Sequence, residues 1–304
     1  MENLNELKEK NGSTAFSIRT FDHLNTVKET ADSYTLSKMQ NLKEFKEEGV
    51  GTTAVPIKDI NLLNKPITRK IIEFASKSVC KIYPAHMVQG TCAFYQVLDQ
   101  YRNQRFLIMT CNHVLPTNSL NEIIQAIFEF GNIPQLTSFC LVKKHLKYVW
   151  TSKLLDATVM EISPEQAAQF KSLEIKFLKV GKAKLNEEVA ILQYPLGILS
   201  IAHGEIEELS GADVFYRMGT ADGSSGSPLL KWDCVAIAMH NSGTEGATGQ
   251  QPASRRKAIV LEAVINAYLT DESEMQKEIL SLKLEMSKSM CVIKNDCTSL
   301  SDLR

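Results

Sequence analysis

Short apolar runs, separated by turn residues, make up most of the chain between about Ile67 and Leu269. Runs of this length and spacing are typical of antiparallel strands in an all-β sandwich or barrel. Strands and helices do not alternate along this region, which disfavours a doubly wound α/β sheet. The segment AIVLEAVINAYL, after Arg256, predicts a closing helix. The apolar runs are SVCKIY, CAFYQVL, RFLIMTC, LDATVMEI, EEVAILQYP, SPLLKW and CVAIAMH.

Both ends of the chain show helical periodicity instead. Residues 1–66 predict a polar arm with one amphipathic helix that ends near Gly49, followed by a linker. Residues 67–270 form the strand-rich domain, and residues 271–304 predict an amphipathic helical tail. We expect the terminal helices to pack on the core; the alternative is that they bind a regulatory partner or mediate self-association. The apolar positions of the tail are Met275, Ile279, Leu282 and Met286, which is heptad spacing.

Charge and composition exclude several classes of protein. The 304 residues include 34 Lys and Arg against 35 Asp and Glu, a formal net charge of −1, which disfavours nucleic-acid binding through bulk positive charge. No apolar stretch reaches the roughly 18 residues of a transmembrane helix, so no membrane partner is expected. The N-terminus lacks the apolar core of a secretory signal. We therefore expect an intracellular protein, either cytoplasmic or nuclear.

The cysteines indicate neither a disulfide framework nor a metal site. Their number is odd, and they show no CxxC motif and no paired spacing. In the absence of an export signal, free thiols in a reducing compartment are expected. No two Cys or His residues lie at zinc-ligand spacing, because Cys111 and His113, two positions apart, are poorly spaced to ligate one metal ion together. The seven are Cys80, Cys92, Cys111, Cys140, Cys234, Cys291 and Cys297.

The segment Gly219–Leu230, GTADGSSGSPLL, gathers small residues around Ser225 and precedes an apolar strand. A Gly-X-Ser-Gly turn folds the backbone tightly behind a serine and lets N–H groups converge on one point, as an oxyanion hole requires. Taken alone, the segment fits a flexible Gly/Ser loop equally well.

Two further segments favour the nucleophile turn over the flexible loop. FLIMTCNHVL places His113 at the end of an apolar strand, and KLLDATVMEI places Asp156 at the head of another. Alone, such a histidine is usually structural and such an aspartate is usually a turn or cap residue. Together with Ser225 they follow the order His, Asp, Ser, at intervals of 43 and 69 residues. This is the chain order of the chymotrypsin-type triad and differs from the subtilisin and α/β-hydrolase orders.

On these motifs the chain resembles the chymotrypsin-fold (trypsin-like) serine peptidases over about Ser76–Leu269. TCNHVL is similar to their Thr-Ala-Ala-His motif, LDATVMEI to their Asp-Ile-Ala-Leu strand, and DGSSGSP to their Gly-Asp-Ser-Gly-Gly-Pro loop. The variant Gly-X-Ser-Gly-Ser-Pro resembles glutamyl endopeptidases and the intracellular trypsin-like peptidase domains of animals. The resemblance implies a mostly β fold of two six-stranded antiparallel barrels, which divide near residues 165–185.

The resemblance also implies an activity: a serine endopeptidase that forms an acyl-enzyme intermediate on a protein or peptide substrate. His113 would act as the general base, Asp156 would orient its imidazole, and Ser225 would be the nucleophile. The backbone N–H groups of Gly223 and Ser225 would form the oxyanion hole. The reaction needs no metal or organic cofactor.

The preferred P1 side chain is predicted from residues at fixed sequence distances from Ser225. Thr220 and His240 lie five residues before and fifteen after Ser225, where glutamyl endopeptidases place a Thr and a His that bind the P1 carboxylate. Viral chymotrypsin-like cysteine proteases place a similar pair against P1 glutamine. We expect Asn241 and Gly243, which follow His240, to contact substrate as well. No acidic residue stands before Thr220, which disfavours P1 Lys or Arg. Alternatively, His240 only narrows the pocket and P1 is hydrophobic.

The sequence departs from the family pattern in ways that bear on control. Asn112 replaces the usual small residue before the base, and no Ile-Val-Gly-Gly activation site is visible. Ser224 cannot form the carboxylate pair of the trypsin zymogen switch, so control is expected from the N-terminal arm or the tail. A catalytically silent peptide-binding module on the same fold is the main alternative. A scaffold that binds partners through residues 1–50 and 271–304 is a weaker one.

Overall fold

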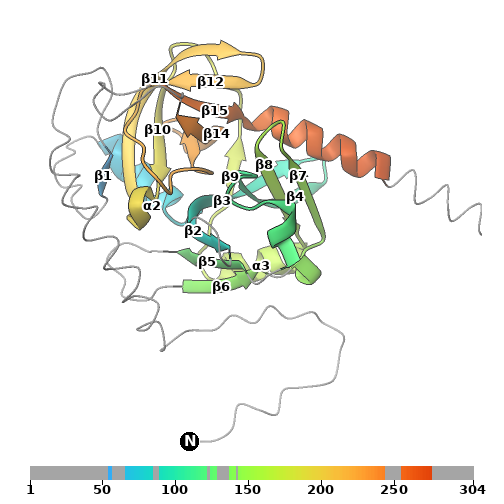
Figure 1. The fold of residues 1–304 in the computed structure, drawn as a ribbon. Helices are drawn as coiled ribbons and strands as arrows, with labels where there is room; N and C mark the ends of the chain where they lie inside the picture. The colour runs from blue at the N-terminus through green and yellow to red at the C-terminus, as the bar shows by residue number, and fades with distance from the viewer. Residues whose placement is uncertain are drawn as a thin grey trace, which may run out of the picture. The chain divides into compact units, whose positions relative to one another are not determined.

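The structure, a computed structural model, describes residues 54–56, 66–84, 89–121, 124–128, 137–141, 143–243 and 255–275. The amphipathic helix expected before Gly49 and the heptad positions after Met275 lie outside the described residues. The chain divides into two compact units, residues 1–262 and residues 263–304. All the described strands belong to the first unit (Figure 1).

Seven strands from the first half of this unit pair antiparallel in a continuous series. The central strands of this series are apolar and buried on both faces, which explains why their sequence runs do not alternate. A helix, α2 (Pro66–Ala75), precedes the series. In order of pairing the strands are β6 (Thr137–Leu141), β5 (Ile124–Phe128), β2 (Val79–Pro84), β3 (Gly90–Leu98), β4 (Gln104–Thr110), β8 (Ala157–Ile162) and β7 (Tyr148–Ser152).

Six strands from the second half close into an antiparallel barrel (Figure 1). Closure pairs every strand with two neighbours and leaves no exposed edge. The barrel interior is filled by buried side chains that include Val189, Ile191, Ile206, Val214 and Tyr216. Around the ring the strands are β10 (Glu188–Gln193), β11 (Ser200–Ser210), β12 (Asp213–Tyr216), β15 (Arg256–Val260), β14 (Val235–Gly243) and β13 (Pro228–Leu230).

A short strand joins the two sets. β9 (Leu178–Val180) runs parallel to both β3 and β14 and pairs with each. It follows α3 (Pro164–Ser172), whose start is fixed by a capping box in which Ser163 and Gln166 each bond the other's backbone N–H. The change from one set of strands to the other therefore falls within residues 165–185. The remaining elements are β1 (Val55–Pro56), which pairs with β11, and the 3₁₀ turns η2 (Thr117–Asn121), η3 (Lys143–His145) and η4 (Pro195–Gly197).

The predicted mostly β, chymotrypsin-like architecture is confirmed, and every one of the seven apolar runs contains a strand. Of the two six-stranded barrels expected, the second closes with six strands, whereas the first half pairs seven described strands in series. One helix boundary was wrong. Residues 258–260 belong to β15, and the closing helix spans residues 261–275. Ala258 pairs with both Val214 and His240, so pairing on two sides overrides the helical pattern of the local sequence. No helix in the described part of the chain is long and apolar enough to cross a membrane.

The strand register also creates a cysteine pair that sequence spacing did not reveal. Cys80 on β2 lies opposite Cys92 on β3, and their Sγ atoms are 2.8 Å apart in a thiol–thiol hydrogen bond. Burial, and then the contact with Cys92, raises the pKa of the Cys80 thiol well above its ordinary value. A protonated thiol is a poor nucleophile, so burial protects this pair. Cys111 and Cys234 are likewise buried, and neither forms a disulfide.

We expect the native protein to contain no disulfide. Rapid alkylation of the folded chain should leave Cys80, Cys92, Cys111 and Cys234 unmodified, because all four are buried. Alkylation after unfolding without reductant should then modify all seven cysteines, as counted by mass spectrometry. A pair that reacts only after reduction, above all Cys80 with Cys92, would contradict the expected reducing compartment.

Candidate active site

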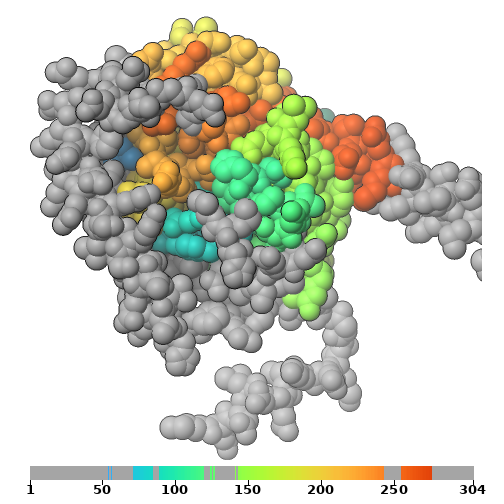
Figure 2. Space-filling view, viewed as in Figure 1, coloured from blue at the N-terminus to red at the C-terminus, as the bar shows by residue number. Residues whose placement is uncertain are grey.

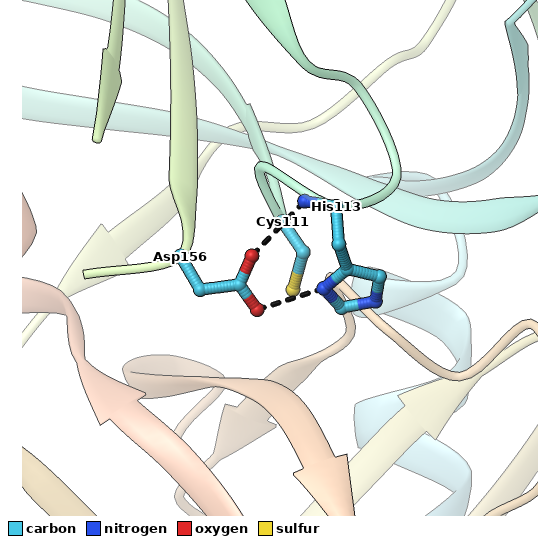
Figure 3. A group of neighbouring side chains, drawn as sticks. All are labelled: Cys111, His113 and Asp156. Atoms are coloured by element: carbon cyan, nitrogen blue, oxygen red, sulfur yellow. Dashed lines mark hydrogen bonds and ion pairs between the residues drawn. The ribbon is translucent and has the colours of Figure 1, made fainter. Parts of the chain in front are cut away.

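His113 and Asp156 meet because β4 pairs with β8. The register sets Thr110 opposite Thr158, so the loop after β4 and the turn before β8 lie together. The His113 ring Nδ1 is 2.8 Å from Asp156 Oδ2, and the backbone N–H of His113 donates to Oδ1 at 3.0 Å (Figure 3). One carboxylate thus holds both ring and backbone. With a proton on Nδ1, the lone pair on Nε2 is available to act as a base.

The backbone at Asp156 is in the left-handed region, with φ of 47°. This conformation is uncommon for residues other than glycine, although aspartate tolerates it. The turn before it is tied by a hydrogen bond from the Leu155 N–H to Ser152 Oγ at 3.1 Å. Strained backbone of this kind gathers at functional sites, where surrounding contacts hold it. Here the turn aims the carboxylate at His113.

Cys111 completes a cluster with these two residues. The cysteine Sγ, a His113 ring nitrogen and an Asp156 oxygen all lie within 4.8 Å of one another (Figure 3), a spacing that could suit a metal ion. Burial and then the charge of Asp156 raise the pKa of the Cys111 thiol well above its ordinary value. The protonated thiol donates to the His240 carbonyl at 3.2 Å and so ties the His113 loop to β14. Within the cluster, Asp156 alone orients the imidazole.

Ser225 lies in a tight turn between two glycines with positive φ, Gly223 at 93° and Gly226 at 92°. Within the turn, Ser224 donates its N–H to Ala221 and accepts the Ala221 N–H on its side chain, at 3.0 and 3.1 Å. Among the described residues, the N–H groups of Gly223 and Ser225 have no hydrogen-bond acceptor. They are the two donors predicted for the oxyanion hole, and both are available.

Backbone contacts clamp this turn between the two sets of strands. Thr91 on β3 donates its N–H to the Ser225 carbonyl at 2.8 Å and its hydroxyl to the Gly223 carbonyl at 2.7 Å. The His240 carbonyl on β14 accepts both the Gly226 N–H, at 2.8 Å, and the Cys111 thiol. A Cβ on Gly226 would stand 2.0 Å from the Thr91 carbonyl oxygen, so only glycine fits.

The same contacts set the His113 loop beside the nucleophile turn, since Cys111 precedes His113 by two residues and Gly226 follows Ser225. Green residues of the first set border orange residues of the second on the face shown in Figure 2. The structure joins His113 directly to Asp156. It links Ser225 to them through the backbone, and the described contacts include no hydrogen bond from the Ser225 hydroxyl to the His113 ring. In proteins without bound substrate, such bonds often tighten only in the complex.

His240 occupies the end of the second barrel with a partner that the sequence analysis missed. Its ring Nδ1 is 2.6 Å from the Tyr216 hydroxyl, and both side chains are buried. Burial, helped by the charge of Arg256, lowers the pKa of His240 to about 3, so the ring is neutral at physiological pH. When the Tyr216 hydroxyl donates to Nδ1, the proton of this neutral ring lies on Nε2, which becomes a donor. Tyr216 stands nine residues before Ser225, and only pairing within the barrel reveals its role.

The other predicted substrate residues surround a side chain that the sequence also did not single out, Arg256. The Thr220 carbonyl accepts from Arg256 Nη2 at 3.5 Å, and Gly243 lies opposite Arg256 across β14 and β15. Asn241 is buried, and its Oδ1 has no hydrogen-bond partner in the described part of the chain. Four of these residues, Thr220, His240, Gly243 and Arg256, therefore lie around one end of the barrel.

Known proteins resemble this chain in structure only. No protein-family model matches its sequence, and no curated protein does. The Rv3671c protease from M. tuberculosis, in its active form, has a TM-score of 0.45 at 18% identity over 73% of this chain and 90% of that chain. A human pathogenic astrovirus serine protease has a TM-score of 0.40 at 17% identity, over 62% and 91%. The HtrA-type protease AlgW with a tripeptide has a TM-score of 0.47 at 13% identity, over 65% and 61%.

Scores and identities this low do not assign an activity.

Proposed function

We propose that this chain is a serine endopeptidase in which His113, Asp156 and Ser225 act as the catalytic triad. The observation that carries the proposal is the double hydrogen bond from His113 to the Asp156 carboxylate, at 2.8 and 3.0 Å. It leaves one ring nitrogen free to act as a base, next to a turn that presents a serine. No other role accounts so simply for a strained aspartate, a half-exposed histidine and a glycine-flanked serine held together.

The chemistry follows from these atoms. A serine hydroxyl is a weak nucleophile at neutral pH and needs an adjacent base. Nε2 of His113 takes the Ser225 proton while Oγ attacks the scissile carbonyl, and Asp156 stabilises the resulting imidazolium. The negative oxygen of the tetrahedral intermediate accepts hydrogen bonds from the N–H groups of Gly223 and Ser225. His113 then protonates the leaving amine, and water hydrolyses the acyl-enzyme by the same route in reverse.

We further propose that the P1 side chain is Glu or Gln. The Tyr216 hydroxyl donates to His240 Nδ1 and so leaves the Nε2 N–H of the neutral ring as a donor at the barrel end, from which a side-chain oxygen of P1 can accept. A P1 Lys or Arg would meet the cation of Arg256, and a buried ammonium without an acidic partner is costly. The alternative, a hydrophobic P1, requires His240 to act only as a wall of the pocket.

A peptide library scanned at P1 tests both parts of the proposal. Cleavage should require Ser225, and P1 Glu or Gln should be cleaved faster than P1 Lys or Arg. His240→Ala should lower kcat/KM for these preferred substrates about ten- to a hundredfold, the usual effect of losing a buried donor to a polar or charged group. Small apolar P1 residues should be spared.

His203→Ala is the matched control, because His203 stacks on Trp232 and takes no part in the proposed pocket. Its P1 profile should equal that of the wild type. A profile led by Phe, Tyr or Leu, and unchanged by His240→Ala, would reduce His240 to a structural residue.

A further inference from the structure

We infer that Arg256 is a specificity-determining residue of this site, one that binds a carboxylate on the P1 side chain and so separates Glu from Gln. The inference rests on the proposed peptidase function and identifies the residue that makes P1 Glu a better substrate than P1 Gln. It comes from position and charge on β15, independently of the triad.

Arg256 reaches the proposed pocket from its place in the barrel. It is the first residue of β15, and its Cα lies opposite Tyr216 on β12 and Gly243 on β14. Residues opposite each other in an antiparallel sheet project from the same face. Two residues further along, Ala258 lies opposite His240, so His240 projects from that face too. The guanidinium, whose Nη2 is 3.5 Å from the Thr220 carbonyl, therefore lies among the P1 residues.

Among the described residues, the charge of Arg256 has no carboxylate partner, unlike the charges of its two neighbours on the chain. Arg255 forms an ion pair with Glu208, and Lys257 forms one with Asp213. For Arg256, no carboxylate of the described residues is a partner, and its Nε is buried without a hydrogen bond. Arginine stays protonated in proteins, and the half-buried Arg256 side chain keeps an unpaired cation partly out of water, which is costly. A cation held this way beside a substrate pocket is explained if the substrate supplies the missing anion.

A carboxylate fits this pocket better than an amide does. Apart from Arg256 the polar groups nearby are neutral, since burial keeps His240 and the Tyr216 phenol uncharged. A P1 amide could accept from His240, but it would leave the guanidinium unpaired. A P1 carboxylate can accept from His240 and also form charge-assisted hydrogen bonds with the planar guanidinium. The pocket should therefore select Glu over Gln.

The preference for Glu should also have a distinctive pH dependence. The charged and titratable groups around His240 are Tyr216, Arg256, Cys111 and His113, with the Lys257 backbone as a further partner. We define the Glu/Gln ratio as kcat/KM for a P1 Glu peptide divided by kcat/KM for the matching P1 Gln peptide. If a protonated His240 bound the P1 carboxylate, this ratio would fall as pH rises through about 6.5, the ordinary histidine pKa. Because Arg256 stays charged, binding of the carboxylate by Arg256 keeps the ratio level from about pH 5.5 to 8.

The test compares kcat/KM for two peptides that differ only in P1 Glu or Gln. Wild type should prefer Glu, and Arg256→Gln should lower the Glu/Gln ratio about ten- to a hundredfold, mainly through loss on the Glu peptide. Arg256→Lys keeps the positive charge but loses the planar guanidinium that can donate two parallel hydrogen bonds to a carboxylate. It should lower the ratio less than Arg256→Gln does. Arg255→Gln removes the same charge from a paired neighbour and should leave the ratio unchanged.

Several results would overturn the inference: no Glu preference in the wild type, an equal fall in Arg255→Gln, or a ratio that declines through pH 6.5. If Arg256→Gln does not fold, the Arg256→Lys ratio decides, and an unchanged ratio counts against the inference.

Failure of the proposed function would look different. In that case the wild type hydrolyses neither peptide, and the two peptides are compared instead by calorimetric binding to the intact chain. Tighter binding of the Glu peptide that is lost in Arg256→Gln still supports a carboxylate site. Equal binding of both peptides overturns it.

Discussion

Replacing Ser225 with alanine is expected to lower kcat for peptide hydrolysis by roughly 10⁶, if the scale known for subtilisin triads applies here. His113→Ala should cost about as much, because neither the nucleophile nor its base works without the other. For the same reason the double variant should be little worse than either single one. Steady-state hydrolysis of a P1 Glu peptide, with active-site titration of the wild type, measures the effect.

The folded state should not suffer from Ser225→Ala. The Ser225 side chain makes no hydrogen bond within the described structure, so its removal should change the free energy of unfolding by less than about 0.5 kcal/mol. Urea unfolding of both proteins checks this. Ser210→Ala, on the exposed end of β11, is the matched control and should keep full activity. Wild-type hydrolysis by Ser225→Ala would show that the nucleophile is a different residue.

Asp156→Asn should be the second most damaging change, lowering kcat about 10⁴-fold as the equivalent change does in other triads. The carboxylate now accepts from both the ring and the backbone N–H of His113. An asparagine amide can donate to Nδ1 instead, which places the ring proton on Nε2 and removes the lone pair that Ser225 needs. Kinetics on the same P1 Glu peptide measure the loss.

Asp233→Asn is a suitable control for this experiment. Within the described structure, the Asp233 carboxylate accepts a hydrogen bond from the Val235 N–H at 3.2 Å, in a turn at the start of β14. Its activity should equal that of the wild type. If Asp156→Asn retains activity within tenfold of the wild type, Asp156 does not orient the base.

The parts of the fold that could be predicted are the strands whose identity depends on a few neighbouring residues in the sequence. Each short apolar run holds a strand because a continuous apolar stretch of this length, bounded by turn residues, indicates a buried strand without reference to its distant partners. β15 was mistaken for helix because Ala258, Ile259 and Val260 continue an apolar run that a helix could also use. Only their pairing with β12 and β14 decides, and pairing partners lie far away in sequence.

The candidate site likewise contains residues that sequence motifs reveal and residues that only strand pairing reveals. His113, Asp156 and Ser225 could be proposed from their order and flanking motifs. Tyr216 and Arg256 carry no motif, since a tyrosine in a strand and an arginine before an apolar run are ordinary. Their importance appears only when strand register sets them opposite each other at the barrel end. Cys80 and Cys92 were missed for the same reason, because only the register of β2 and β3 brings their sulfurs together.

Labelling of the purified full-length chain with a fluorophosphonate probe tests the central claim most directly. A serine activated by an adjacent base reacts with such a probe, whereas an ordinary serine does not. The account predicts one label per chain, located at Ser225 by peptide mapping, lost in Ser225→Ala and His113→Ala and retained in Ser210→Ala. No labelling at any pH, with or without a P1 Glu peptide present, would contradict it and favour a catalytically silent peptide-binding module.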